Sequence, residues 1–328
     1  MALFFIEGFD TGDFSRWYEN GFGSITTTRF SSGRSASIGS NVSTVGFSPV
    51  AQLFAGFAFN SNAGTRWTND MLRLFTDAGA TLQLSLSIKS AGVLSLYLGG
   101  NGGGTLLGTA TIPSTGWMYL EVSATINSTG GAVVVRLNGV TVISYTGNTK
   151  NGGTSTSIDT ISFSGSINNY YFDDLYMCDA TGTTNNTFLG DVRVQTLMPN
   201  GAGSSTQLTP TGSASNYVNV SEIPDNTATY NSSSTVGQRD TYAMADLVAT
   251  TNTIYGIQNN IVAWKSDAGT AGIKPSVLTN STLYYSPTIM LSASPYSYAS
   301  PVLESNPVTG VAWTAADVNG AEFGAEVA

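Results

Sequence analysis

The sequence contains no histidine, and its single cysteine is Cys178. Without histidine there can be no Ser-His-Asp or Cys-His catalytic site, and the commonest general base at neutral pH is missing. Structural zinc sites need several cysteines or histidines, so they are excluded as well. One cysteine cannot form an intrachain disulfide, and we interpret Cys178 as a buried, inert thiol. The fold must therefore be stabilised by packing.

Charge is also scarce. Only 10% of the residues are charged, against a usual value of about 25%, and the formal net charge is −9. Nucleic acids and anionic membranes require clustered Lys and Arg, so neither is an expected partner. No apolar run approaches the roughly 18 residues of a membrane span. Residues 1–5 are apolar, but acidic residues follow at once without a cleavage site, which indicates a first strand and not a signal peptide.

What the sequence does contain is apolar surface and turn residues. It is 41% hydrophobic and 11% aromatic, with 37 glycines and many Ser, Thr and Asn residues. This is too apolar for disorder and typical of strands joined by polar turns. Residues 180–187 are Gly, Thr and Asn without an apolar period, which indicates a domain boundary. We therefore expect an all-β chain with two tandem antiparallel β-sandwich domains, residues 1–179 and 188–328.

The strongest local signal is a hairpin over residues 132–146. Asn138-Gly139 suits a type I′ turn, because both residues tolerate positive φ. An apolar row would then lie on one face of a hairpin that we interpret as a central piece of the sandwich. The predicted register pairs Leu137 with Val140, Val135 with Val142 and Val133 with Ser144.

Other segments predict individual elements. Residues 51–60 are continuously apolar, which indicates a central strand covered on both faces. Residues 82–88 alternate, so that the Leu and Ile side chains would face inward, with Gln83, Ser85 and Ser87 facing solvent. In the second half we expect strands over 188–197, 213–220, 242–247, 254–265, 273–278, 283–291, 296–303 and 322–327, a turn over 199–203, and a helical turn capped by Thr314.

Two resemblances accompany these patterns. The Glu7-Gly8-Phe9-Asp10 strand end, the hairpin 136–140 and the strand 172–176 together resemble the concanavalin A-like lectin/glucanase jelly roll in its laminin-G-like form, over residues 1–179. In the second half, a module found in structural proteins of tailed bacteriophages is similar over residues 188–328. Its four ordered motifs lie at residues 189–194, 199–203, 233–238 and 313–324. This second resemblance implies a virion component and brings no catalytic or binding residues.

The acidic residues do not suggest an enzyme. A glycosidase needs two carboxylates roughly 5 to 10 Å apart across one sugar. The glucanase branch of the jelly roll carries acidic residues at alternate strand positions, and no strand has that pattern here. Asp173 and Asp174 are adjacent, so on a strand they point to opposite faces, and we interpret them as a strand-end turn or surface pair. We predict no catalytic residue.

Binding sites are better candidates. Asp10, Asp13 and Asp173 would converge on a calcium ion if the first and last strands are neighbours, and we expect no other cofactor. For glycan binding, the candidate aromatic residues are Trp17, Trp67 and Tyr170, with core packing as the competing role.

The leading functional hypothesis is a non-enzymatic bacteriophage virion protein, either a head decoration or a tail appendage such as a fibre, assembled in the host cytoplasm. It would contact capsid or tail proteins and copies of itself as a homo-oligomer, because few charges need desolvation. The alternative is a carbohydrate-binding adhesin that recognises host surface glycans. A polysaccharide-degrading glycosidase ranks last.

Overall fold

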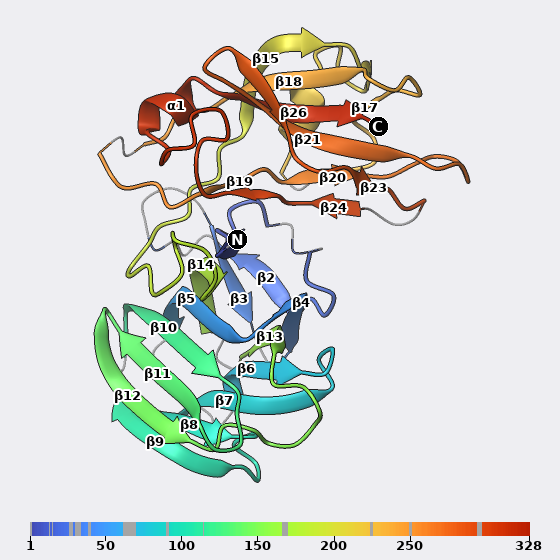
Figure 1. Cartoon of the computed structure of the whole chain (residues 1–328). Helices are drawn as coiled ribbons and strands as arrows, with labels where there is room; N and C mark the ends of the chain where they lie inside the picture. The colour runs from blue at the N-terminus through green and yellow to red at the C-terminus, as the bar shows by residue number, and fades with distance from the viewer. Residues whose placement is uncertain are drawn as a thin grey trace. The chain divides into compact units, whose positions relative to one another are not determined.

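The chain is nearly all β-structure (Figure 1). The computed structural model describes residues 2–12, 14, 16–25, 29, 34–38, 41–61, 70–89, 92–113, 115–165, 170–223, 226–248, 251–293 and 297–328. It divides into two compact units, Met1–Val194 and Gln195–Ala328. The first unit thus includes the predicted linker 180–187 and the seven residues after it.

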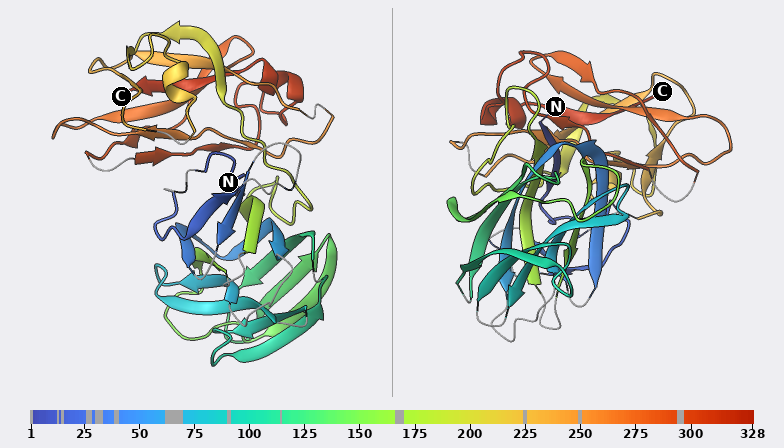
Figure 2. Two further views of the ribbon diagram at one scale, coloured as in Figure 1. Left: turned by 180° about the vertical axis from the view of Figure 1, so that it is seen from behind. Right: turned by 60° about the horizontal axis from the view of Figure 1, so that its bottom comes forward.

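The first unit is an antiparallel jelly-roll β-sandwich of two sheets (Figures 1 and 2), as the sequence predicts. The first sheet has the order β12 (Val140–Gly147), β11 (Gly131–Leu137), β10 (Trp117–Thr125), β5 (Gln52–Ser61), β14 (Tyr170–Asp179), β3 (Ser35–Ile38) and β2 (Phe22–Ile25), and β1 (Leu3–Glu7) also pairs with β14. The second has the order β4 (Val42–Val50), β13 (Ile158–Ser164), β6 (Asp70–Thr76), β7 (Thr81–Lys89), β8 (Val93–Leu98) and β9 (Thr105–Thr111).

Aromatic side chains fill one end of the space between these sheets. The Phe57 ring lies 5.0 Å from the Phe163 ring at a near-perpendicular angle, and Phe163 is also 5.0 Å from Phe172. All three are essentially inaccessible to solvent. Burying a side chain of this size contributes about 1.5 to 3 kcal/mol. Because the chain cannot form an intrachain disulfide, packing of this kind has to stabilise the sandwich.

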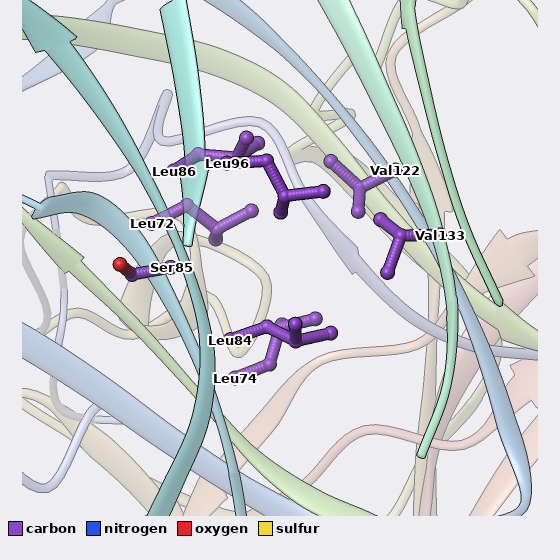
Figure 3. Close-up of a pocket in the computed structure, with 8 residues that line it drawn as sticks. All are labelled: Leu72, Leu74, Leu84, Ser85, Leu86, Leu96, Val122 and Val133. Atoms are coloured by element: carbon purple, nitrogen blue, oxygen red, sulfur yellow. The ribbon is translucent and has the colours of Figure 1, made fainter. Parts of the chain in front are cut away.

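Elsewhere the interior is aliphatic and contains a small void of about 10 Å³ (Figure 3). Its lining is Leu72, Leu74, Leu84, Ser85, Leu86, Leu96, Val122 and Val133. A void of this size holds about one water at most and, being apolar, stays dry. It is a packing defect and has no room for a ligand.

Strand β5 is central, as predicted, because it lies between β10 and β14. Its residues 53–59 are buried throughout. The glycine at position 56 is required by close approach, since a Cβ there would lie 2.2 Å from Cε1 of Tyr176. The outer face of the first sheet is therefore covered by protein at this point.

The hairpin β11–β12 has the predicted turn and the predicted pairing of Leu137 with Val140, but a different register farther from the turn. Asn138 and Gly139 have φ values of 48° and 80°. A bulge between Val135 and Arg136 places Ile143, not Val142, opposite Val135. Val140, on the turn side of the bulge, is 66% exposed. The expected apolar row was therefore wrong beyond the turn, because a bulge shifts the pairing by one residue. The hairpin is also not central, since β12 is the edge strand.

Strand β7 is buried on both faces, so the expectation that one of its faces is exposed to solvent was wrong. Leu84, Leu86 and Ile88 are buried as predicted, but Gln83, Ser85 and Ser87 are buried too. The two serine hydroxyls donate to Oδ1 of Asp70 at 3.0 and 2.7 Å, and the Gln83 amide donates to the Thr76 hydroxyl at 2.8 Å. An alternating pattern gives the direction of side chains, but not whether other residues cover them.

The second unit is antiparallel as well. Its largest sheet in the described residues has the order β15 (Pro199–Thr206), β18 (Arg239–Met244), β26 (Glu322–Val327), β21 (Gly272–Thr279) and β22 (Thr282–Tyr285), with β23 (Ile289–Met290) also on β21. Two-stranded ribbons pair β16 (Thr209–Thr211) with β17 (Tyr230–Ser232), β19 (Ile257–Gln258) with β25 (Val302–Leu303), and β20 (Ile261–Ala263) with β24 (Ser297–Ala299). Ile257 and Leu303 pack on a core that contains Val277, Trp313 and Phe323.

Predictions for this unit had mixed outcomes. The helix α1 (Ala315–Asn319) begins at Thr314 with a full capping box, and β26 follows it, as expected. Residues 188–197 form no strand, the expected turn 199–203 lies in β15, and 213–220 contains only the 3-10 helix η1 (Val218–Val220). The segment 254–265 forms two short strands, β19 and β20, in place of one long strand. Strand β15 is Gly- and Ser-rich, and its strand state comes from pairing with β18, which local propensity does not reveal.

Candidate functional site

The structure describes two of the three predicted calcium ligands, Asp10 and Asp173. Asp173 is buried, and its pKa is raised to about 8, first by burial and then by the charges of Asp174 and Asp10. Asp10 accepts a hydrogen bond from the Arg34 backbone N–H at 2.9 Å. Asp13 lies outside the described residues. Within the described residues no three acidic, Cys or His side chains are arranged to hold a metal, so calcium stays a prediction.

Two of the three predicted glycan-stacking residues lie in the core. Trp17 is 2% exposed with its ring 4.9 Å from Phe22, and Tyr170 is 3% exposed with its ring 5.2 Å from Phe59. Neither ring presents a free face for stacking on a sugar. Trp67 lies outside the described residues.

Asp173 and Asp174 are not the surface pair that the sequence suggested. Asp174 is a bulge residue with φ 52° and is 1% exposed. Its carboxylate accepts a hydrogen bond from Arg29 at 2.9 Å and one from the Val194 backbone N–H at 2.7 Å. Burial raises the pKa of Asp174 to about 6, and the Val194 and Arg29 contacts oppose the rise. The pair lies inside the fold because the bulge turns both side chains toward internal partners.

The outer face of the first sheet carries polar groups that the sequence did not single out. The Tyr176 hydroxyl donates to Oε1 of Glu121 at 2.6 Å, and the Tyr119 hydroxyl donates to the Asp174 carbonyl at 3.0 Å. Glu121 is fully buried. We call Tyr119, Glu121, Asp174 and Tyr176 the polar face. The alternation in β10 places Tyr119 and Glu121 opposite the core side chains, but nothing local indicates that they are covered.

The polar face is covered by residues 188–194, which we call the strap. Backbone N–H groups of Leu189 and Gly190 donate to the Tyr176 hydroxyl at 3.0 Å and to Oε1 of Glu121 at 2.8 Å. Arg29 donates to the Val192 carbonyl at 3.2 Å and pairs with Asp191. The covered carboxylates therefore have donors supplied by the chain itself, and the polar face is closed to ligands in this conformation.

Among the described residues of the first unit, one aromatic ring is presented to solvent. Tyr18 is 64% exposed, the most exposed aromatic side chain among the described residues. Its hydroxyl is hydrogen-bonded to Thr160 on β13, and the ring edge lies near the glycines at positions 46 and 79. A Cβ at position 46 would lie 3.7 Å from Cε1 of Tyr18. We call this ring with its glycine support the Tyr18 platform.

The platform is held by the backbone as well as by the ring. The Tyr18 N–H donates to the Thr44 carbonyl at 3.0 Å, and the Thr44 N–H donates to the Glu19 carbonyl at 2.9 Å, so this segment pairs with β4. Burial of the hydroxyl raises the pKa of Tyr18, as do the charges of Glu19 and Asp159, while the Thr160 hydrogen bond opposes the rise. Tyr18 was not among the binding residues predicted from the sequence, although its position next to a buried Trp17 could have indicated the outward direction.

No protein-family model matches the chain, and no curated protein matches it in sequence. Solved structures with similarity include the cellulose-induced protein Cip1, at 14% identity and TM-score 0.43 over 54% of this chain and 97% of that one. The carbohydrate-binding module CBM66 from Bacillus subtilis has 10% identity and TM-score 0.33 over 49% and 98%. Domain 4 of the arabinanase AbnA from Geobacillus stearothermophilus, in complex with arabinotriose, has 14% and 0.38 over 54% and 92%. Values this low do not carry a function over to the chain.

Within the described residues, no helix is both long enough and apolar enough to cross a membrane. The described residues thus offer one open candidate site, the Tyr18 platform, and one closed candidate site, the polar face beneath the strap.

Proposed function

We propose that the first unit is a carbohydrate-binding domain that contacts its ligand through the Tyr18 platform. The observation that carries this proposal is that Tyr18 is 64% exposed while its backbone is paired with Thr44 and its hydroxyl with Thr160. An exposed tyrosine in a rigid setting is an amphipathic surface, with an apolar ring face and a polar tip. A sugar ring has the complementary form, with an apolar C–H face and hydroxyl groups around its edge.

Fixing the ring before binding matters for affinity. A mobile side chain loses about 0.5 to 1.5 kcal/mol of rotamer freedom when a ligand immobilises it. The hydrogen bond of the Tyr18 hydroxyl to Thr160 restricts the ring before a ligand binds, and the backbone pairing with Thr44 holds the segment in place. The buried Trp17 anchors the same segment in the core. The platform is thus preorganised.

Polar groups beside the ring can orient a ligand. Glu19 and Asn20 are exposed next to Tyr18. Carboxylate and amide oxygens accept hydrogen bonds from hydroxyl donors, and the amide nitrogen donates in return. A single stacked ring contributes only about 1 to 3 kcal/mol, less than the roughly 4 kcal/mol of a millimolar complex, so we expect millimolar or weaker affinity for one site.

The experiment is a glycan array followed by titration of any hit against three variants of the full chain. We expect Tyr18→Ala to lose binding at least ten-fold, and Tyr18→Phe to lose less, since the ring face remains. Tyr255→Ala is the matched control, because Tyr255 is the other exposed aromatic side chain among the described residues, at 37%, and belongs to the second unit. Binding that survives Tyr18→Ala unchanged, or no binding to any glycan at millimolar concentration, contradicts the proposal.

A virion role is the second candidate, supported by the phage-like motifs over residues 188–328 and by the low content of charged residues. The two roles are compatible, since an adhesin can be a virion component, and in both the protein acts by binding and not by catalysis. Mass spectrometry of purified virions tests it through the copy number. Hundreds of copies would indicate a head decoration and a few to dozens a tail appendage, while absence from virions contradicts the role.

A further inference from the structure

We propose that the strap, residues 188–194, opens as a unit from the first sheet while the sandwich stays folded, and that it thereby acts as a cover for the polar face. This inference concerns the protein without ligand and does not depend on glycan binding. Its basis is how the strap is attached, what lies beneath it and where it stands in the chain.

The attachment consists of isolated contacts and not of a strand ladder. The strap has no strand residues. Three of its backbone N–H groups donate to side chains of the sheet, on Tyr176, Glu121 and Asp174, at 2.7 to 3.0 Å. Segments held without backbone pairing belong to the low-stability end of a fold and open before the core does.

One apolar anchor of the strap is the ring at its start. Phe188 lies 5.2 Å from Phe54 in an edge-on arrangement, and the Arg136 guanidinium lies 4.0 Å from its centroid. Phe188 is only half-buried. Loss of this ring should therefore loosen the strap and leave the interior of the sandwich intact.

The closed state leaves polar atoms unsatisfied. Oε2 of Glu121 and Nε of Arg136 are buried without a hydrogen-bond partner among the described residues. The two residues are cross-strand partners in β10 and β11, and both lie beneath the strap or against it. A buried polar atom without a partner costs free energy that hydration restores. Opening the strap admits water to both atoms, and their hydration offsets part of the free energy needed to break the hydrogen bonds of the strap.

Opening of the strap would also change the length of the connection to the second unit. The exposed residues 180–184 precede it in the linker, and the second unit begins at Gln195 directly after it. Seven residues released from the sheet can span at most about 25 Å when fully extended. An open strap would thus expose the polar face and lengthen the tether to the second unit in the same step.

Hydrogen exchange on the full chain tests the proposal. The amides of Leu189, Gly190 and Val194 report on the strap, and those of Leu120 and Val122 in β10 report on the core. We expect the strap amides to exchange at least 100-fold faster than the core amides, by an opening that low concentrations of urea do not accelerate. Equal rates for strap and core would overturn the proposal, because the strap would then open only with global unfolding.

The variant Phe188→Ala tests whether the strap opens independently of the core or is an integral part of it. Phe188→Ala should speed exchange of the strap amides ten-fold or more and leave Leu120 and Val122 unchanged, with Phe188→Leu in between. Val140→Ala, at an exposed hairpin position, is the control and should change neither set. If Phe188→Ala accelerates strap and core amides by the same factor, the strap is part of the sandwich and the inference fails.

Discussion

Trp17 and Tyr18 are neighbours in the chain, and their side chains lie in opposite environments. Trp17 is in the core and Tyr18 is 64% exposed. Both residues are aromatic, so composition gives no reason to separate them. The Tyr18 platform could therefore be identified only from the pairing of this short segment with β4, which the sequence does not show.

The raised pKa of Asp173 predicts that the stability of the fold depends on pH. Its pKa is raised to about 8 in the folded protein, chiefly by burial, against 3.8 as the ordinary value. Between these values the unfolded chain has released its proton and the folded chain has kept it, so stability falls as pH rises from about 4 to about 8. Asp173→Asn removes this loss, and we expect about 2 kcal/mol higher stability at pH 8 with no gain near pH 3. Urea unfolding at several pH values measures it.

The matched comparison is Asp174→Asn. Asp174 pairs with Arg29 and accepts the Val194 N–H, so its neutralisation should weaken an ion pair and destabilise the protein at neutral pH. If Asp173→Asn is instead less stable than the unchanged protein at pH 8, the burial penalty on its carboxylate does not dominate.

Calcium has a separate test at the same residues. If Asp10, Asp13 and Asp173 bind the ion, millimolar calcium should raise the melting temperature, since a ligand of the folded state stabilises it by mass action. Asp10→Asn, Asp13→Asn and Asp173→Asn should each abolish the rise. A melting temperature that is the same with calcium and with chelator would remove the prediction.

Among the secondary-structure elements, those that local sequence specifies could be predicted, and those that depend on contacts with other strands could not. The Asn138-Gly139 turn, the apolar run of β5 and the Thr314 cap are encoded within a few residues each, and all three could be predicted. The bulge in β11 and the strand state of β15 depend on a partner strand. The strap has β-like alternation, yet its backbone bonds to side chains of another element. A hydrophobic pattern shows which face of a segment is apolar, but not which other segment will pack against that face.

The helix cap in the second unit is a local device with a measurable size. Thr314 Oγ1 accepts the Asp317 N–H at 3.1 Å, and Asp317 accepts the Thr314 N–H at 3.0 Å. Thr314→Ala should cost about 1 kcal/mol in unfolding of the second unit, and Thr314→Ser should cost much less, because serine keeps the acceptor. Urea denaturation followed by tryptophan fluorescence, to which Trp313 of the second unit contributes, checks this. Equal stability of the alanine and serine variants would show that the cap contributes nothing.

Across the whole molecule, several of the few charged groups are buried and serve as internal structure. The acidic residues of the first unit that are under a tenth exposed are Glu7, Asp70, Glu121, Asp159, Asp173 and Asp174. Each of them accepts at least one hydrogen bond from a neighbouring N–H or O–H group, so their charges are used within the fold. A surface poor in charge suits binding to uncharged, hydroxyl-rich partners, which agrees with a stacking platform in place of an ionic site.

The two compact units allow these properties to be separated. The Tyr18 platform, the polar face and the strap all belong to the first unit, and the capped helix belongs to the second. Changes at one should therefore add to changes at the other, because sites without shared partners act independently. A glycan-binding defect in Tyr18→Ala should leave the unfolding of the second unit unchanged.

The most direct test of carbohydrate binding is an NMR titration of the full chain with the best ligand from a glycan array. We predict that shift changes centre on the Tyr18 ring and on the amides of Glu19, Thr44 and Thr160, and that Tyr18→Ala abolishes them. Shift changes confined to other residues, or their persistence at the same ligand concentration in Tyr18→Ala, would contradict carbohydrate binding at the Tyr18 platform.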